Sequence, residues 1–453
     1  MVSLRRKIFF YFFVLLFFVL SFYVICYAQG YRIKLTIPPS FEMFQKTGMI
    51  LVKSEPGDAL IYLNNEPRQS LVTRYLWSSS GYYHTPAKIK NLLPGEYNIK
   101  LEKEGYHPWE EKIKVYPSRI TKLADVHLFR QGLPLKLAEE KFSPDTLSPN
   151  KKFLAAPGKG IIFNLESQTK INLDIPREEE KEVVSPVYWS PQSDRFWWNN
   201  YLIYPGEKSK TENLSSYLPE NLDKIQWGER GEKIYYQTDQ GFYSFDPETK
   251  ENSKLYSENY SDYLLSGDYL FVLQNGDNHK LLIKNLDSEE SYQSLRLPYS
   301  PGYEIKEFRN DLIHIYDREY NNLYLVEFNP PLLILRETLN NLKYYKWLNS
   351  EEIIYGNDFE IWSLNLEEKQ KTLHSRISQK IKNLATHPES GNIIYYTDKE
   401  IKVIGRQKNN KISITELTQV NNISNLFLGK DNKDIYFNAQ IGNQSGFYKL
   451  NIK

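Results

Sequence analysis

A short turn that follows an aromatic-rich strand recurs along most of this chain. The turns occupy residues 147–150, 189–192, 227–230, 265–268, 308–311, 347–350, 385–388 and 428–431. Successive turns lie roughly 40 residues apart, which is the length of one four-stranded propeller blade. Second and third short strands follow most of the turns, as at 233–236 and 242–245. We therefore predict a β-propeller of eight four-stranded blades, or of seven if one repeat is irregular.

The last repeat lacks a fourth strand, because the chain stops at Lys453 soon after its third strand at 447–450. Residues 133–137, Leu-Pro-Leu-Lys-Leu, precede the first turn without a blade of their own. An unpaired strand edge invites aggregation. We predict that 133–137 pairs with the third strand of the last blade and closes the ring.

An apolar run at residues 8–28 directly follows Arg5, Arg6 and Lys7. As a helix it would be roughly 30 Å long, which is enough to cross a bilayer. Basic residues before a first span favour a cytoplasmic N-terminus. We predict a cytoplasmic tail at 1–7, a transmembrane signal-anchor at 8–28, a linker at 29–47 and extracytoplasmic domains after it. A cleaved signal peptide is the alternative.

The composition excludes several classes of protein. Lys and Arg number 57 against 56 Asp and Glu, so no global field attracts nucleic acid. The one cysteine, Cys26, lies in the predicted span, so disulfides and Cys-ligated metals are excluded beyond it. Tyrosine is abundant at 35 residues, and short apolar runs alternate with polar residues. This pattern is typical of strands with one buried face, so we expect a mainly β protein.

Between the predicted span and the repeats, alternating strands are separated by Pro-Gly and Gly-Tyr turns. The segments are Ser-Glu-Pro-Gly-Asp-Ala at 54–59, Ile-Tyr-Leu-Asn at 61–64, Thr-Pro at 85–86, Leu-Pro-Gly-Glu-Tyr at 93–97 and Gly-Tyr at 105–106. This order predicts a compact antiparallel sandwich. It resembles the PEGA domain, a small β module of bacterial and archaeal envelope proteins, over residues 48–129. The resemblance implies binding or spacing at the cell surface and no catalytic role.

Two features depart from the PEGA pattern. The turn that names the family is permuted to Pro-Gly-Asp-Ala at 56–59, and the stretch 65–84 is unusually long. The long stretch carries Tyr75, Trp77, Tyr82 and Tyr83 among serines. These aromatic residues suit a partner-contact loop, although they can equally pack back over the sandwich.

The repeats themselves are similar to the TolB-like and WD40-like propeller repeats, in which a Ser-Pro-Asp-Gly turn joins the inner strand to the next one. Ser-Pro-Asn-Lys at 148–151 and Ser-Pro at 190–191 keep that turn, and later repeats have diverged. The resemblance implies a fold and carries no activity.

Sequence motifs for catalysis, metal binding and cofactors are missing. The chain has no nucleophile elbow, zinc-protease motif, P-loop, dinucleotide fingerprint or EF-hand loop. Its seven histidines lack the spacing of metal ligands. We therefore expect no catalytic residue, no metal and no cofactor.

Polar residues recur between the second and third strands of several repeats, where propeller loops share one rim. They and an adjacent tryptophan are Trp198, Asn199, Asn200, Asp239, Asp317, Asn357, Asp358 and Asp398. Asp and Asn are also common turn formers, which explains them without any ligand. The functional hypothesis is a polar and aromatic rim that binds a protein or a glycan.

Three functions remain open. The first is a membrane-anchored, non-enzymatic envelope protein whose propeller binds a protein or glycan partner. The second is an extracytoplasmic propeller enzyme that acts on glycans with carboxylates at the mouth of the tunnel. The third is a sensor or assembly subunit that docks onto a larger complex. We favour the first, because propellers host many functions and no catalytic constellation is visible.

Overall fold

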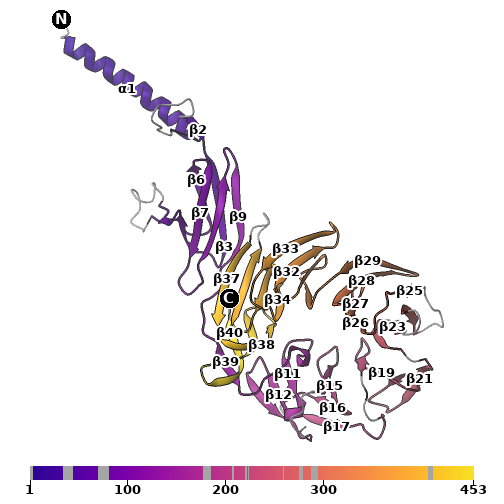
Figure 1. The fold of residues 1–453 in the computed structure, drawn as a ribbon. Helices are drawn as coiled ribbons and strands as arrows, with labels where there is room; N and C mark the ends of the chain where they lie inside the picture. Colours follow the sequence, from indigo (N-terminus) through magenta and orange to yellow (C-terminus); the bar gives the residue numbers. More distant parts are fainter. Residues whose placement is uncertain are drawn as a thin grey trace.

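The computed structural model describes residues 4–33, 44–69, 81–176, 185–206, 209–219, 222, 224–258, 260–274, 279–286, 294–406 and 412–453. Three parts follow one another in space: a long helix, a small pair of sheets and a ring of sheets (Figure 1). The chain is mainly β, as predicted.

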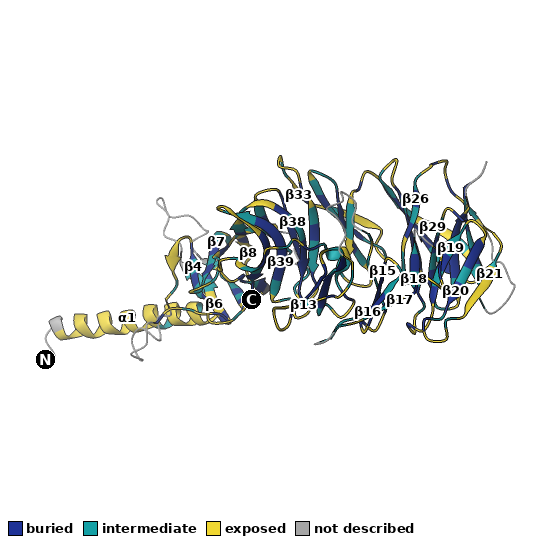
Figure 2. Ribbon diagram, turned by 90° about the horizontal axis from the view of Figure 1, so that it is seen from below, coloured by how far each residue is buried: buried dark blue, intermediate teal, exposed yellow. Residues whose placement is uncertain are grey.

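Helix α1 spans Leu4–Ala28 and contains the predicted apolar run. Its segment Arg6–Ala28 has a mean hydropathy of 2.7, and none of it is buried against the rest of the chain. Phe, Leu, Val and Ile side chains are exposed all around the helix (Figure 2). A helix that is apolar on every side and is not buried against the described part of the chain has the length and composition of a membrane anchor or a signal sequence.

The small module consists of two packed sheets. One has the order β6-β3-β9 (Ala87–Leu92, Gly48–Glu55 and Ile120–His127), and the other β5-β4-β7-β8 (Glu66–Pro67, Leu60–Leu63, Gly95–Glu102 and Trp109–Val115). A short pair, β1 (Tyr31–Ile33) with β2 (Phe44–Lys46), links it to α1. Alternate residues of each strand, such as Ile50 and Val52, fill the core between the sheets.

The residues that carry the PEGA resemblance hold this module together. Thr85 accepts a hydrogen bond from the Ala59 amide at 3.0 Å, and its hydroxyl lies 2.6 Å from that of Ser54. The Tyr97 hydroxyl donates to the Leu93 carbonyl at 2.8 Å. These turn residues therefore serve the fold of the module.

Eight sheets make up the ring within the described residues, which resolves the choice between seven and eight blades. Blade 1 is β11 to β13 (Phe153–Ala156, Ile161–Asn164, Thr169–Asn172), blade 2 is β14 to β17 (Tyr188–Trp189, Phe196–Trp198, Tyr201–Tyr204, Lys210–Asn213), blade 3 is β18 to β21 (Ile225–Trp227, Ile234–Thr238, Gly241–Phe245, Asn252–Tyr256) and blade 4 is β22 to β25 (Asp262–Ser266, Tyr269–Gln274, Lys280–Asn285, Leu295–Arg296). Blade 5 is β26 to β29 (Tyr303–Arg309, Leu312–Asp317, Asn322–Asn329, Leu332–Leu339), blade 6 is β30 to β33 (Tyr344–Trp347, Glu352–Gly356, Glu360–Asn365, Gln370–Arg376) and blade 7 is β34 to β37 (Asn383–His387, Asn392–Tyr396, Glu400–Arg406, Ile412–Gln419). Blade 8 contains β38 to β40 (Asn421–Leu428, Asp434–Ile441, Gln444–Asn451).

Burial within a blade explains its sequence. We label the strands A to D from the centre of the ring outward. Strand B of blade 7, Asn392–Tyr396, is buried at every position, because neighbouring blades cover both of its faces. Strand D of blade 3, Asn252–Tyr256, is exposed at four of its five positions. Apolar runs therefore mark the B and C strands, and polar runs mark the outer edge.

Strand β10 (Leu135–Ala138) closes the ring. It pairs antiparallel with β40, and Leu135 lies opposite Lys449. The first and last segments of the propeller thus share blade 8, and the edge of β40 is covered. Blade 1 in turn has three strands, with an isolated bridge between Leu147 and Leu154 in place of its A strand.

The small module is attached to the outer edge of the ring at blades 7 and 8. The Trp109 indole N–H donates to the Ser413 hydroxyl on β37 at 3.1 Å. Phe129 is buried in the apolar cluster that blades 7 and 8 share. Lys453 forms ion pairs with Glu55 of the module at 3.4 Å and with Glu389 at 2.9 Å. The module and the ring are therefore connected by apolar and by charged contacts.

Candidate functional site

Loops that join strands B and C lie on the same side of the ring as the loops that join neighbouring blades, because the strands of each blade alternate in direction. We call this side the BC rim. All the residues of the rim hypothesis belong to its B–C turns or to the strand ends beside them.

A turn-capping side chain recurs along the BC rim at intervals of 40 residues. Asp317 Oδ1 accepts hydrogen bonds from the amides of residues 319 and 320, at 3.0 and 3.3 Å. Asn357 Oδ1 accepts from residues 359 and 360, at 2.9 and 3.0 Å. The hydroxyl of Thr397 accepts from residues 399 and 400, at 3.3 and 3.2 Å. Such side chains mimic a backbone turn, so the turn-former explanation accounts for Asp317 and Asn357.

The carboxylates that follow these caps form ion pairs with lysines. Asp358 lies 2.7 Å from Lys343, and Asp398 lies 2.6 Å from Lys382. Each lysine directly precedes the A strand of the same blade. The rim over blades 6 and 7 is therefore polar with balanced charge.

Two residues of the rim hypothesis are buried. The Trp198 side chain is 2% exposed in the core between blades 1 and 2, and Asp317 is 1% exposed. Neither presents its side chain to a ligand, because each is needed for packing or for its turn. Asn199 and Asn200 form the following turn with positive φ angles of 44° and 61°, and Asn residues tolerate this region well.

Blade 3 repeats this arrangement in part. The amide of Gln240 donates to the Thr238 hydroxyl at 3.1 Å, and Asp239 lies between them in the B–C turn. Thr238 thus takes the capping position that Asp317 and Asn357 hold in later blades.

Exposed aromatic side chains lie beside these turns, and the sequence interpretation missed them. Tyr299 is 75% exposed, Tyr320 59% and Phe359 48%. The loops of Tyr299 and Tyr320 touch, because the Ser300 hydroxyl donates to Asp317 at 2.7 Å. A sequence signal existed: Tyr320 and Phe359 each follow a turn cap by two or three residues. The rim hypothesis thus has an exposed aromatic part centred on blades 5 and 6.

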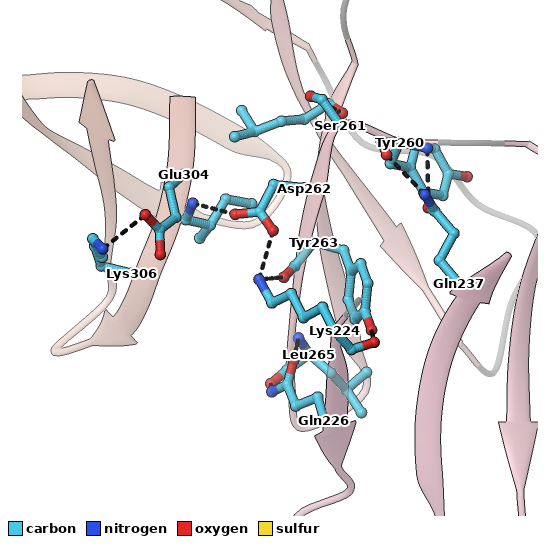
Figure 3. A network of polar contacts seen from close by, with 12 residues as sticks. Lys224, Gln226, Gln237, Tyr260, Ser261, Asp262, Tyr263, Leu265, Glu304 and Lys306 are labelled. Carbon is cyan, nitrogen blue, oxygen red and sulfur yellow. Dashed lines mark hydrogen bonds and ion pairs between the residues drawn. The ribbon is translucent and has the colours of Figure 1, made fainter. Parts of the chain in front are cut away.

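Inner strands of blades 3, 4 and 5 are joined by a network of polar contacts (Figure 3). Lys224 Nζ lies 2.6 Å from Asp262 Oδ1, and Asp262 Oδ2 accepts from the Ile305 amide at 2.7 Å. The Gln226 side chain makes two hydrogen bonds to the backbone of Leu265. Its Nε2 donates to the Leu265 carbonyl, and its Oε1 accepts from the Leu265 backbone N–H at 2.7 Å. These charges near the ring centre are used to connect blades.

On the opposite side of the ring, a groove of about 240 Å³ opens between blades 5 and 6. Its carboxylates are also partly paired. Glu327 lies 3.0 Å from Arg336, and Glu337 lies 3.0 Å from Lys371. Across the described residues, no group of three or more His, Cys, Asp or Glu side chains is arranged to hold a metal ion.

The proposed partner-contact loop is only partly described. Tyr75 and Trp77 lie outside the described residues. Tyr82 is exposed, whereas Tyr83 packs against the core of the module. One of the two described aromatic residues therefore remains available for contact.

A buried histidine, His314, packs between blades 5 and 6. The His314 ring is fully buried beside Tyr345 and Trp347, and neither ring nitrogen has a hydrogen-bond partner among the described residues. Its Nδ1 lies 3.3 Å from Glu307. Burial, with a smaller contribution from Arg309, lowers the pKa of His314 to about 3.

This burial predicts a pH dependence of stability. In the unfolded chain the histidine takes up a proton near pH 6.5, whereas in the folded chain it stays neutral to about pH 3. The unfolded state therefore binds more protons in this window, and stability falls as the pH is lowered through it. We expect His314→Phe to reduce the slope of the unfolding free energy against pH by roughly 1 kcal/mol per pH unit. Urea titrations between these two pH values test this, and parallel profiles for variant and wild type would contradict it. His84→Gln is the control, because the His84 side chain is exposed.

Comparisons with known proteins give one family match and several similar structures. The PEGA domain family model matches residues 79–128, the second half of the predicted module. No curated protein sequence matches the chain. Among solved structures, the C-terminal WD40 domain of Sif2 is similar at 11% identity and a TM-score of 0.48, covering 71% of this chain and 98% of its own. A eukaryotic initiation factor is similar at 14% identity and a TM-score of 0.49, covering 67% of this chain and 88% of its own. The Dos1 propeller is similar at 12% identity and a TM-score of 0.47, covering 72% of this chain and 96% of its own. The ring of eight sheets makes the chain a β-propeller protein, and it carries a PEGA domain match and an apolar N-terminal helix.

Proposed function

We propose that this protein is a single-pass membrane protein whose propeller acts as a non-catalytic binding platform outside the cytoplasm. Its partner in this proposal is an envelope protein or a glycan. The observation that carries the proposal is the exposed aromatic part of the BC rim, Tyr299, Tyr320 and Phe359, next to carboxylates that are already paired. Exposed aromatic side chains supply binding energy to protein and glycan surfaces with little loss of conformational entropy.

The helix supports the membrane part of this proposal. Its apolar segment Arg6–Ala28 is long enough to span a bilayer, and Arg6 and Lys7 stand at its N-terminal end. The position of these charges supports a cytoplasmic N-terminus. The module and the propeller would then lie together on the other side of the membrane.

The non-catalytic part is supported by how the polar groups are used. Asp317 caps a turn, Asp358 and Asp398 pair with lysines, and Asp262 near the ring centre connects neighbouring inner strands. Carboxylates that hold turns, pair with lysines or connect strands are already used by the fold, which favours a structural role over general acid–base catalysis. The glycan-enzyme alternative has no comparable support among the described residues.

We expect the double variant Tyr299→Ser, Tyr320→Ser to lose binding to isolated envelope polymers by about tenfold or more, because two exposed rings typically supply over 1 kcal/mol. The measurement is co-sedimentation of the full chain in detergent with envelope polymers, before and after glycan digestion. Loss of binding after digestion identifies a glycan, and retention identifies a protein.

The control is Ile334→Ser on the outer strand β29, where the apolar Ile334 is 48% exposed. Binding that survives in the double variant, or that falls as much in the control, would refute the rim assignment. Asp358→Asn with Asp398→Asn tests the polar part of the rim. Undiminished binding in that variant would remove these carboxylates from the site.

A further inference from the structure

Lysines recur among the described side chains of the outward face of sheet β6-β3-β9. Lys88 and Lys122 lie on either side of Leu51 in register. Lys90 lies on the same face of β6 and Lys53 on the same face of β3, and all four lysines are exposed. On β3, the acidic residue Glu55 lies at the end away from α1, where it pairs with Lys453 of the propeller at 3.4 Å.

These lysines have no ion-pair partner among the described residues, in contrast to many lysines of the ring. Lys343, Lys382 and Lys224, for example, each form an ion pair of 2.7 Å or less. A face of unpaired positive charge is complementary to an anionic surface.

This face begins at the end of the module that adjoins α1. Gly30, two residues after the helix, accepts hydrogen bonds from the amide and the hydroxyl of Thr47, both at 2.8 Å. Gly48 then starts β3, and Lys88 and Lys122 flank its fourth residue, only ~10 Å further along the strand. Figure 1 shows β6 in the part of the module nearer α1, whereas β3 and β9 run side by side from that end toward the propeller. A membrane that holds α1 would therefore lie close to these lysines, within about one or two Debye lengths.

Aromatic and basic residues continue the pattern at the same end. The 116–119 turn is tied to the start of β3, because the Ser118 amide donates to the Thr47 carbonyl at 3.0 Å and the Met49 amide donates to the Arg119 carbonyl at 3.1 Å. Exposed Tyr116 in this turn is flanked by the Arg119 guanidinium, 5.9 Å from its ring centre. Tyrosine with arginine or lysine is the combination that proteins use at the headgroup layer of a bilayer.

We infer that the α1 end of the module binds the headgroups of anionic phospholipids in the membrane that holds α1. Lys88, Lys90, Lys122 and Arg119 supply the charge, and Tyr116 enters the headgroup layer. The contact would hold the module in one orientation on the bilayer. This inference rests on the proposed membrane anchoring.

The test compares the full chain in nanodiscs of phosphatidylcholine with nanodiscs that also contain phosphatidylglycerol. Native mass spectrometry measures which lipid stays bound, and hydrogen exchange measures protection of residues 116–119. We expect phosphatidylglycerol to be enriched about tenfold on the protein, and the enrichment to decline with added salt. The triple variant Lys88→Gln, Lys90→Gln, Lys122→Gln should lose the enrichment.

A charge-matched control is Lys233→Gln, Lys346→Gln, Lys399→Gln, three exposed propeller lysines, and it should keep the enrichment. Equal retention of both lipids by the wild type, or equal loss in both triple variants, would overturn the inference. Binding of soluble polyphosphate without any preference among lipids would assign the face to a polymer and would also overturn it. Failure of the wild-type chain to insert into either nanodisc would instead refute the proposed anchoring.

Discussion

A Phe447→Ala variant is expected to lose about 3 to 5 kcal/mol of unfolding free energy. Phe447 on β40 is fully buried where the two ends of the propeller meet. Its ring centre lies 5.1 Å from that of Phe142, which precedes blade 1, and 5.9 Å from that of Phe163 in blade 1. Truncation leaves a cavity between the first and last blades that the paired strands cannot close by small movements.

Chemical denaturation followed by tryptophan fluorescence measures this loss. Phe359→Ala on the exposed BC rim is the matched control, and it should change the unfolding free energy by less than about 0.5 kcal/mol. Phe447→Leu should fall between the two, because it keeps most of the buried volume. A midpoint for Phe447→Ala close to that of the control would contradict the packing described for blade 8.

The second expected result concerns Asn438, which is buried on β39 in the same blade. Its side-chain carbonyl accepts from the Phe142 amide at 3.1 Å, and its amide group donates to the Phe142 carbonyl at 2.7 Å. Asn438→Ala would leave the buried Phe142 amide without its partner, whereas the Phe142 carbonyl would keep the hydrogen bond that Asn425 donates at 3.0 Å. An unsatisfied buried group costs about 1 to 3 kcal/mol, so we expect a loss of about 1 to 3 kcal/mol.

Asn438→Asp separates the two hydrogen bonds. The carboxylate can still accept from the Phe142 amide, but it places an acceptor against the Phe142 carbonyl, so we expect a loss at least as large as for alanine. Asn443→Ala in the exposed hairpin between β39 and β40 is the control. Equal unfolding midpoints for Asn438→Ala and Asn443→Ala would show that Asn438 does not connect the ends of the ring.

The repeat spacing and the missing last strand were sufficient to predict the propeller, because each blade repeats the same local pattern. A turn, a buried B strand such as Asn392–Tyr396 and an exposed D strand such as Asn252–Tyr256 each leave a sign in the sequence. The PEGA resemblance was likewise readable from its ordered turns, and the family match at 79–128 confirms it. Local patterns of this kind need no knowledge of distant contacts.

The site was harder to predict, because burial depends on neighbours that are far away in the sequence. Trp198 and Asp317 resemble rim residues in their loops, yet blade contacts and turn hydrogen bonds bury them. The pairing of Asp358 with Lys343 joins residues 15 positions apart, and no motif announces it. The exposure of Tyr299 became visible only once the loops between blades were placed in space.

The attachment of the module has a consequence for access to the ring. The Trp109 to Ser413 contact reaches the outer strand of blade 7, and the helix, the module and the ring follow one another roughly in line (Figures 1 and 2). The ring is thus attached to the module by its outer edge, and both of its flat sides face the surrounding space. Two different molecules have room to bind simultaneously, one on each side, without displacing each other or the tether.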